Sequence, residues 1–214
     1  MTTTKRTGRQ AKRALDPVTF EILRNSFINA VELMSQQFRR GQTEWSHEFF
    51  AKDFSCSLAD AQGNPVAQGE QDIAVHIGTH HTVIQRVIEE FKDDINPGDV
   101  FITNDPYGGG THFNDVRILR PIFAESELIA WATANGHWSD VGGLVPGSFD
   151  VKAREHFGEG LRITPVRIWA NGTFKADIAR FIVGNTRAPQ DNLSDLNAQV
   201  EATRVCEREV LRLV

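Results

Sequence analysis

The stretch "VRILRPIFAESELIAWATAN", residues 116–135, indicates the fold more clearly than any other part of the sequence. Two apolar runs flank the short polar segment "AESE", which is typical of a β-hairpin with a tight turn. If the turn centres on Glu125 and Ser126, antiparallel pairing places Asp115 opposite Gly136 and beside His137. The polar residues that flank the hairpin should therefore meet at its open end.

Segments on both sides of the hairpin predict further strands. "FSCSLAD" (residues 54–60) alternates as a strand does, and the turn residues "AQGN" can lead it into a second strand, "PVAQ". "VFITN" (residues 100–104) is a short apolar strand, and "LRITPVRIW" (residues 161–169) is a strand that ends at the turn "ANGT". A sheet built largely from hairpins follows.

Helical spacing appears at both ends of the chain. Asp16 and Pro17 form an N-cap signal, after which apolar residues recur at threes and fours from Phe20 to Phe38. Similar spacing appears from Val83 to Phe91, near "KADIARFIV", and from "APQDNLSDL" to the end of the chain. Because strands and helices lack a regular βαβ order, we predict an α+β fold: a mixed sheet with β-hairpins, an N-terminal amphipathic helix and a long C-terminal helix.

Composition agrees with one globular domain. The chain has 214 residues, of which 40% are hydrophobic and 24% charged, and its formal net charge of −5 does not favour nucleic acid or an anionic membrane as a partner. Residues 1–15 are basic and are predicted to be a disordered arm before a domain at 16–214. The sequence shows neither a membrane-span pattern nor a signal-peptide pattern, so we predict a cytoplasmic protein.

The apolar stripe of the final helix continues almost to the last residue. Leu193, Leu196, Val200, Val210 and Leu211 form this stripe, and "EREVLRLV" follows without a glycine cap. Such an end favours either a helix that packs on a partner or a sequence that is one piece of something longer.

Two similar motifs lie at the ends of the predicted hairpin. "THFND" places His112 three residues before Asp115, and "GHWSD" places His137 three residues before Asp140. When the hairpin pairs, two imidazoles and two carboxylates converge, and these groups ligate divalent Mn, Fe or Zn. The alternative is a purely structural role, in which these residues only cap turns or form hydrogen bonds to the backbone.

Other polar groups near these motifs have two interpretations each. The glycines of "NDPYGGGTHFNDV" form either a flexible turn or a backbone nest for an anion, and they lack the lysine of a Walker loop. "QGEQDIAVHIGTHH" supplies five candidate groups, which we interpret mainly as caps and surface residues, although His76 and Glu70 could face the same cleft. Those five groups are Glu70, Asp72, His76, His80 and His81.

The two cysteines show no metal or redox spacing. Cys56 and Cys206 stand alone in the sequence, which fits a reducing compartment. A role for Cys56 as a small apolar residue within a strand is favoured over a role as a nucleophile.

Seven segments together resemble the hydantoinase B / 5-oxoprolinase family, which includes the alpha-type subunits of acetone and acetophenone carboxylases. The resemblance runs in order from about Asp16 to the C-terminus, and family chains are much longer, so it implies an N-terminal portion. The segments are "DPVTFEILRN", "KDFSCSLADAQGNPVAQ", "HIGTHH", "PGDVFITNDPYGGGTHFNDVRILRPIF", "NGHWSDVGGLVPGS", "EGLRITPVRIW" and "NTRAPQDNLSDLNAQVEA".

The resemblance implies a division of labour between two subunits. A hydantoinase A-type partner binds ATP and phosphorylates a carbonyl or enol oxygen, and the B-type subunit completes hydrolysis of a cyclic amide or carboxylation of a ketone. In the carboxylase branch the B-like subunit holds a manganese-type ion, and the resemblance maps its ligands onto His112, Asp115 and His137, while Asp140 comes from the repeated motif alone. Asp105 and Glu70 are candidates for a general base or for orienting groups.

The sequence therefore predicts a subunit or fragment of an ATP-dependent cyclic-amide hydrolase that carries a divalent metal. Its partners would be the A-type subunit, the remaining part of the B-type subunit and a small cyclic amide or ketone, without nucleic acid or membrane. A ketone carboxylase subunit is one alternative, and a non-catalytic scaffold or truncated fragment is another. Substrate, metal and stoichiometry stay open.

Overall fold

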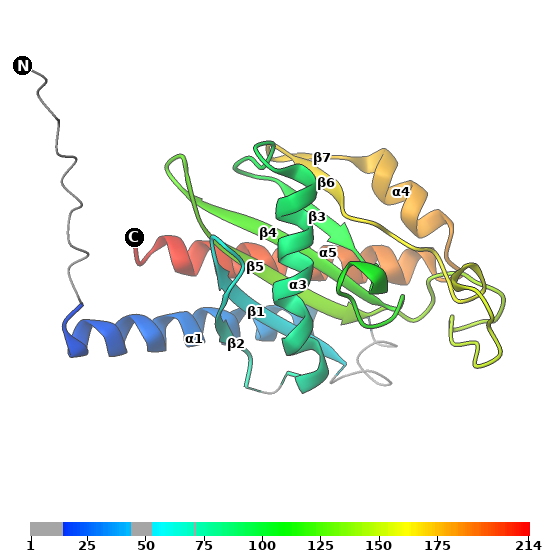
Figure 1. Ribbon diagram of the computed structural model, residues 1–214, viewed down its shortest axis with the longest axis horizontal. Helices are drawn as coiled ribbons and strands as arrows, with labels where there is room; N and C mark the ends of the chain where they lie inside the picture. The colour runs from blue at the N-terminus through cyan, green and yellow to red at the C-terminus, as the bar shows by residue number, and fades with distance from the viewer. Residues whose placement is uncertain (1–14, 44–52, 71) are drawn as a thin grey trace, which may run out of the picture.

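A computed structural model describes residues 15–43, 53–70 and 72–214 of the chain. Its described part contains one seven-stranded sheet in the order β2-β1-β5-β4-β3-β6-β7, and every adjacent pair is antiparallel (Figure 1). The predicted basic arm lies outside the described residues, apart from Leu15. The strands are β1 (Phe54–Asp60), β2 (Pro65–Gln68), β3 (Val100–Thr103), β4 (Asp115–Ala124), β5 (Glu127–His137), β6 (Val166–Ala170) and β7 (Thr173–Phe174).

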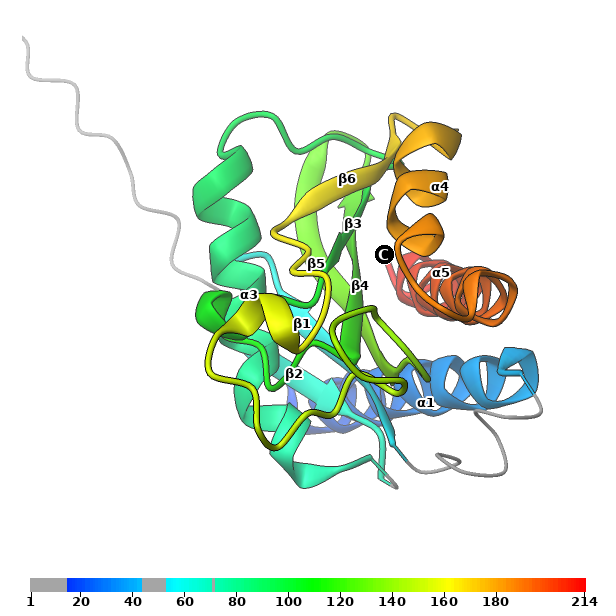
Figure 2. The ribbon, with the colours of Figure 1, turned by 90° about the vertical axis from the view of Figure 1, so that its right-hand side faces the viewer.

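Helices cover both faces of this sheet. In Figure 2, α3 lies on one side, and α1, α4 and α5 lie on the other. Over the described ranges no helix has both the length and the apolar character of a membrane span. The helices are α1 (Pro17–Gly41), α3 (Ala74–Phe91), α4 (Ala176–Gly184) and α5 (Pro189–Leu211), and the 3-10 turns are η1 (Pro106–Gly108) and η2 (His156–Gly158).

Alternation along the strands divides the core between these two layers. Ala132 and Ala134 of β5 pack in the core shared with α1 and α5, whereas Trp131 packs with the apolar side of α3. Because successive strand residues point to opposite faces, both sides of the central strands are apolar over much of their length. The α+β prediction, with its N-terminal and long C-terminal helices, is confirmed.

The two long helices pack on each other and on the sheet. Asp16 caps α1 as predicted, since its side chain accepts hydrogen bonds from the Val18 and Thr19 N–H groups. Phe38 is buried near the end of α1, but Phe20 is 54% exposed because the first turns extend beyond the body (Figure 1). Along α5, Leu196, Val200 and Val210 are buried, while Leu193 and Leu211 are partly exposed.

The β4–β5 hairpin forms as predicted, with one correction to its register. Next to the turn Ala124 pairs with Glu127, but a bulge between Ile122 and Phe123 leaves Ile129 as an extra residue on β5. Beyond this bulge Asp115 pairs directly with His137, so the predicted pairing with Gly136 was wrong. The shift places the two functional side chains opposite each other.

Candidate metal centre

Three side chains from separate segments converge at the open end of the β4–β5 hairpin. His76 Nε2 lies 3.2 Å from Asp115 Oδ2 and 3.7 Å from Asp53 Oδ1. One ligand atom from each of these residues lies within 4.8 Å of the others. Such a group of one imidazole and two carboxylates is able to hold a divalent ion.

Strand pairing explains why these segments meet. β1 and β4 flank β5, so Phe54 pairs with Gly136 on one side and Asp115 pairs with His137 on the other. The His137 N–H also donates to the Asp53 backbone carbonyl at 3.1 Å. Asp53 and Asp115 therefore approach His137 from opposite sides of β5.

The two histidines predicted from the repeated motif lie beside this group. His112 Nε2 is 3.4 Å from Asp115 Oδ1, and the His112 and His137 rings are 5.1 Å apart at an interplanar angle of 70°. The His112 side chain is 39% exposed. His137 Nδ1 lies 3.2 Å from the Trp138 carbonyl oxygen, which orients the ring. The structure thus brings His112, Asp115 and His137 together.

The donor set fits a divalent cation. Asp115 is buried, and within the described part of the chain its Oδ1 accepts no hydrogen bond, while Oδ2 accepts one from the Thr111 hydroxyl. A buried carboxylate oxygen without a donor is costly unless something positive neutralises it. Nitrogen and oxygen donors without thiolate are compatible with Mn, Fe or Zn.

The pKa shifts in this group reflect burial and charge. Burial alone would raise the pKa of the Asp115 carboxyl, but the hydrogen bond from His76 and the nearby His112 hold it well below its usual value. Burial lowers the pKa of His137, and the carboxylates of Asp53 and Asp115 oppose that effect. Both residues are therefore in the forms that ligate a metal at neutral pH.

Polar residues next to the candidate ligands orient them through hydrogen bonds. The Asn135 side-chain amide lies 3.0 Å from His76 Nδ1 and orients that ring. Arg117 is fully buried, and its Nη2 donates to the hydroxyls of Thr79 at 2.8 Å and Thr111 at 3.3 Å. Because Thr111 donates to Asp115, this arginine connects α3 with the loop that carries His112.

The glycine run makes a tight turn around Asp105. The N–H groups of Gly108 and Gly110 both donate to the Asp105 carbonyl, at 3.1 and 3.0 Å. Gly109 has φ +99°, and a Cβ on Gly110 would lie 2.7 Å from that carbonyl oxygen. The Gly109 N–H donates to the Pro106 carbonyl at 3.4 Å, so all three glycine N–H groups are engaged inside the turn. This favours the turn over the anion nest and directs Thr111 and His112 toward Asp115.

Asp140 does not join the histidines. Its carboxylate accepts hydrogen bonds from the N–H groups of Gly142 at 2.8 Å and Gly147 at 2.9 Å, and from Arg187 Nη1 at 3.0 Å. These donors turn the carboxylate into the anchor of the loop that follows β5. Asp140 is therefore not among the proposed metal ligands.

Neither of the two predicted catalytic carboxylates joins the metal-ligating group within the described residues. Asp105 accepts hydrogen bonds from Arg162 through both oxygens, at 2.8 Å each, and from the Tyr107 N–H. Glu70 is exposed, and its backbone N–H donates to Glu32 Oε1 at 2.7 Å. Neither carboxylate contributes an atom to the Asp53, His76 and Asp115 group.

The remaining members of the "QGEQDIAVHIGTHH" segment have structural contacts. Asp72 Oδ2 accepts from the Cys56 N–H at 2.6 Å, His80 Nε2 lies 2.9 Å from Ser55 Oγ, and His81 Nδ1 lies 2.7 Å from the Gly63 carbonyl. Cys56 is completely buried, and burial raises the pKa of its thiol, which agrees with an apolar role. Of this segment, His76 alone joins the metal-ligating group within the described residues.

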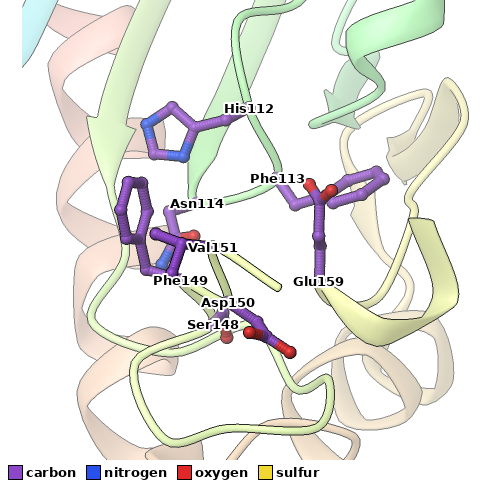
Figure 3. Close-up of a pocket in the computed structure, with 8 residues that line it drawn as sticks. All are labelled: His112, Phe113, Asn114, Ser148, Phe149, Asp150, Val151 and Glu159. Atoms are coloured by element: carbon purple, nitrogen blue, oxygen red, sulfur yellow. The ribbon is translucent and has the colours of Figure 1, made fainter. Parts of the chain in front are cut away.

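A pocket of about 190 Å³ opens beside His112 (Figure 3). Its walls come from the loop that carries His112 and from the loops after β5. The lining residues are His112, Phe113, Asn114, Ser148, Phe149, Asp150, Val151 and Glu159. A small molecule in this pocket would contact the imidazole of His112.

Enzymes of known activity are similar to this chain over most of its length. The family model described as Hydantoinase B/oxoprolinase matches residues 16–214. The beta subunit of caprolactamase from Pseudomonas jessenii is 36% identical over 201 residues, which is 94% of this chain and 34% of that protein. The 5-oxoprolinase of Saccharomyces cerevisiae is 33% identical over 199 residues, which is 88% of this chain and 15% of that protein.

Solved structures share the fold. The crystal structure of ATP-dependent caprolactamase from Pseudomonas jessenii matches 94% of this chain and 34% of that chain, with a TM-score of 0.86 and 33% identity. A nucleotide-free acetone carboxylase matches 93% of this chain and 26% of that chain, with a TM-score of 0.85 and 24% identity, which shows the common fold. The sequence thus spans about a third or less of these relatives.

Proposed function

Because the chain belongs to the hydantoinase B/oxoprolinase family, we propose that it is an N-terminal portion of the B-type subunit of an ATP-dependent cyclic-amide hydrolase. One observation carries this proposal: ligand atoms of Asp53, His76 and Asp115 lie within 4.8 Å of one another at the open end of the hairpin. His112 lies 3.4 Å from Asp115, and the His137 ring lies beside the His112 ring. The proposed ligands are Asp53, His76, His112, Asp115 and His137.

The chemistry follows from this arrangement. A bound divalent ion would polarise a carbonyl or lower the pKa of a bound water toward neutrality. Asp115 and His137 supply donors in the required protonation states, and the buried Arg117 and Asn135 keep their neighbours in position. His112 stands between this group and the pocket, so it faces the reacting end of a substrate.

The proposal includes a hydantoinase A-type partner that binds ATP and phosphorylates the substrate. The caprolactamase relative is named as a beta subunit, and a hydantoinase relative from Pseudomonas sp. is named as a B-type subunit. Both names support a complex of this kind. The proposal also includes a cytoplasmic location for the complex, as the sequence predicts.

A panel of substrates tests the reaction class. The chain would be purified with its A-type subunit and the rest of the B-type subunit, and ATP hydrolysis would be measured with hydantoins, 5-oxoproline and lactams, and with acetone plus bicarbonate. Stimulation by a cyclic amide, with release of its ring-opened product, supports the proposal. Stimulation by acetone and bicarbonate alone favours the ketone carboxylase, for which the acetone carboxylase likeness shows only the fold.

Metal analysis separates the enzyme from the scaffold alternative. Purified wild-type protein should contain a divalent metal, and His112→Ala and His137→Ala should lose most of it because each removes an imidazole from the group. A wild-type protein without bound metal, and without affinity for added Mn²⁺ or Zn²⁺, would favour a non-catalytic scaffold.

A further inference from the structure

The pocket beside His112 has an uneven distribution of charge. Asp150 and Glu159 are acidic, Phe113, Phe149 and Val151 are apolar, and neither lysine nor arginine is among the eight lining residues. Figure 3 shows the Asp150 carboxylate on the side of the pocket opposite the His112 ring. The Glu159 carboxylate lies beside Phe113, apart from Asp150 (Figure 3). One side of the pocket therefore meets His112, and acidic groups lie on two of its other sides (Figure 3).

Well-anchored loops carry the two acidic residues. The buried Ser148, two residues before Asp150, donates its hydroxyl to the Gly142 carbonyl at 2.7 Å and accepts from the Val141 N–H at 2.8 Å. Asp150 Oδ1 accepts from the Lys152 N–H at 2.8 Å. Beside Glu159, the Gly158 carbonyl accepts the Leu144 N–H at 2.8 Å. Both acidic residues are thus part of the folded loop structure.

From this geometry we propose that the pocket selects cyclic amides that lack a carboxylate, namely neutral lactams, over 5-oxoproline. This inference rests on the proposed function and specifies its substrate class. The amide carbonyl would face His112, and the rest of the ring would lie among Phe149, Val151 and the acidic side chains of Asp150 and Glu159.

The hydrolysis reaction explains how Asp150 and Glu159 would affect the choice of substrate. In the phosphorylated amide, the oxygen of one water forms a bond to the former carbonyl carbon, the carbon–nitrogen bond breaks, and the ring nitrogen takes the protons of that water and becomes an amine. The oxygen of a second water then bonds to the same carbon, and the carbon–oxygen bond to the phosphoryl group breaks with release of inorganic phosphate and of the ring-opened amino acid that carries the amine. At neutral pH this amine is an ammonium ion, which the carboxylates of Asp150 and Glu159 attract. In 5-oxoproline the carbon next to the ring nitrogen carries a carboxylate, which the same two groups repel.

Partial exposure limits the expected size of this discrimination. Glu159 is exposed and Asp150 is half-buried, so solvent screens both charges. We expect a preference of about tenfold in kcat/KM, which corresponds to about 1.4 kcal/mol.

A matched pair of substrates tests the inference. 2-Pyrrolidone and 5-oxoproline have the same ring and differ by one carboxylate, so the complete complex would be assayed with each, by release of the corresponding amino acid. The inference predicts a higher kcat/KM for 2-pyrrolidone. An equal or higher value for 5-oxoproline would overturn the inference but leave the proposed hydrolase function standing.

Two variants connect the preference to the acidic residues. Asp150→Asn combined with Glu159→Gln should improve 5-oxoproline use severalfold, mainly through a lower KM, because the repulsion is removed while the pocket shape is kept. Glu155→Gln, an exposed acid in the same region but outside the pocket lining, serves as the matched control and should leave the ratio unchanged. An unchanged ratio in the double variant would contradict the inference. Amino acid release from neither lactam, together with no stimulation of ATP hydrolysis by hydantoins or other lactams, would overturn the hydrolase proposal as well.

Discussion

The two H-x-x-D motifs have the same spacing but different surroundings. Asp115 begins β4, pairs with His137, and is buried against His76 and the imidazole of His112. Asp140 lies after the end of β5, where Gly142, Gly147 and Arg187 donate hydrogen bonds to its carboxylate. Residue spacing alone therefore does not assign a function to a carboxylate, because the role depends on whether metal-ligating side chains or loop N–H donors surround it.

The largest expected difference between the two motifs is in metal affinity. Asp115→Asn should weaken binding of Mn²⁺ or Zn²⁺ by about 100-fold or more, because it removes a charged ligand at the centre of the group. Asp140→Asn should leave the affinity within about threefold of wild type, since its carboxylate contacts loop donors instead. Isothermal titration of the chelator-treated protein measures both, and equal losses in the two variants would contradict the distinction.

A pair of glycine substitutions compares the loop before Asp115, which contains Gly109, with the loop after Asp140, which contains Gly147. Gly109 has φ +99°, and an added Cβ would lie 2.5 Å from Thr82 Cγ2, whereas Gly147 has φ +82° with open space around it. Gly147→Ala should cost about 1 kcal/mol from backbone strain, and Gly109→Ala about 2–4 kcal/mol from strain together with the clash. Urea unfolding of both variants checks this order, and equal costs would show that crowding by Thr82 does not matter.

The anchoring role of Asp140 predicts an effect on stability without a metal. Asp140→Ala should lower the free energy of unfolding by about 1–3 kcal/mol because it leaves the Gly142 and Gly147 N–H groups without their acceptor. Arg187→Ala should cost less, about 1 kcal/mol or below, since the Arg187 side chain is 42% exposed and solvent screens its charge. Chelator-treated protein would be unfolded in urea, and a larger loss in Arg187→Ala would reverse the proposed roles.

The last prediction concerns the pH dependence of the free energy of unfolding. It involves His80, which lies on the same helix as His76. Burial, followed by the nearby Arg117, lowers the pKa of His80 to about 3, below the ordinary value of 6.5. Below pH 6.5 the His80 side chain binds a proton in the unfolded chain but not in the folded chain. The free energy of unfolding therefore falls as pH decreases from 6.5 toward 3. His80→Gln should reduce this slope by up to about 1.4 kcal/mol per pH unit. Urea unfolding of metal-free wild type and His80→Gln would be measured at pH 7 and pH 4.5. An equal change in the free energy of unfolding with pH for the two proteins would contradict this role of His80.

Local sequence signals predicted much of the fold. The β4–β5 hairpin and the capped start of α1 depend on turn residues and apolar spacing, which act over a few residues, and both are present. The register at the open end was missed by one residue because nothing in "ELIAW" marks Ile129 as a bulge. Bulges depend on how the strand fits its neighbours, which a local pattern does not reveal.

The candidate site could be predicted only in part for a similar reason. His112, Asp115 and His137 belong to one hairpin, so local pairing brings them together. Asp53 carries no motif and reaches the site because β1 pairs with β5, a contact between segments far apart in the chain. His76 showed a weak signal, since it lies between apolar residues on a helix that packs over the sheet.

Location of the bound metal would test the central claim most directly. Crystals of the protein in its complex, loaded with Mn²⁺ or Zn²⁺, would be measured at the absorption edge of that metal. We predict one strong anomalous peak within ligand distance of Asp115 and His137, among the side chains of Asp53, His76 and His112, with Asp140 still bonded to Arg187. A strong peak at Asp140, or metal-loaded crystals without a peak between Asp115 and His137, would contradict the proposed metal centre.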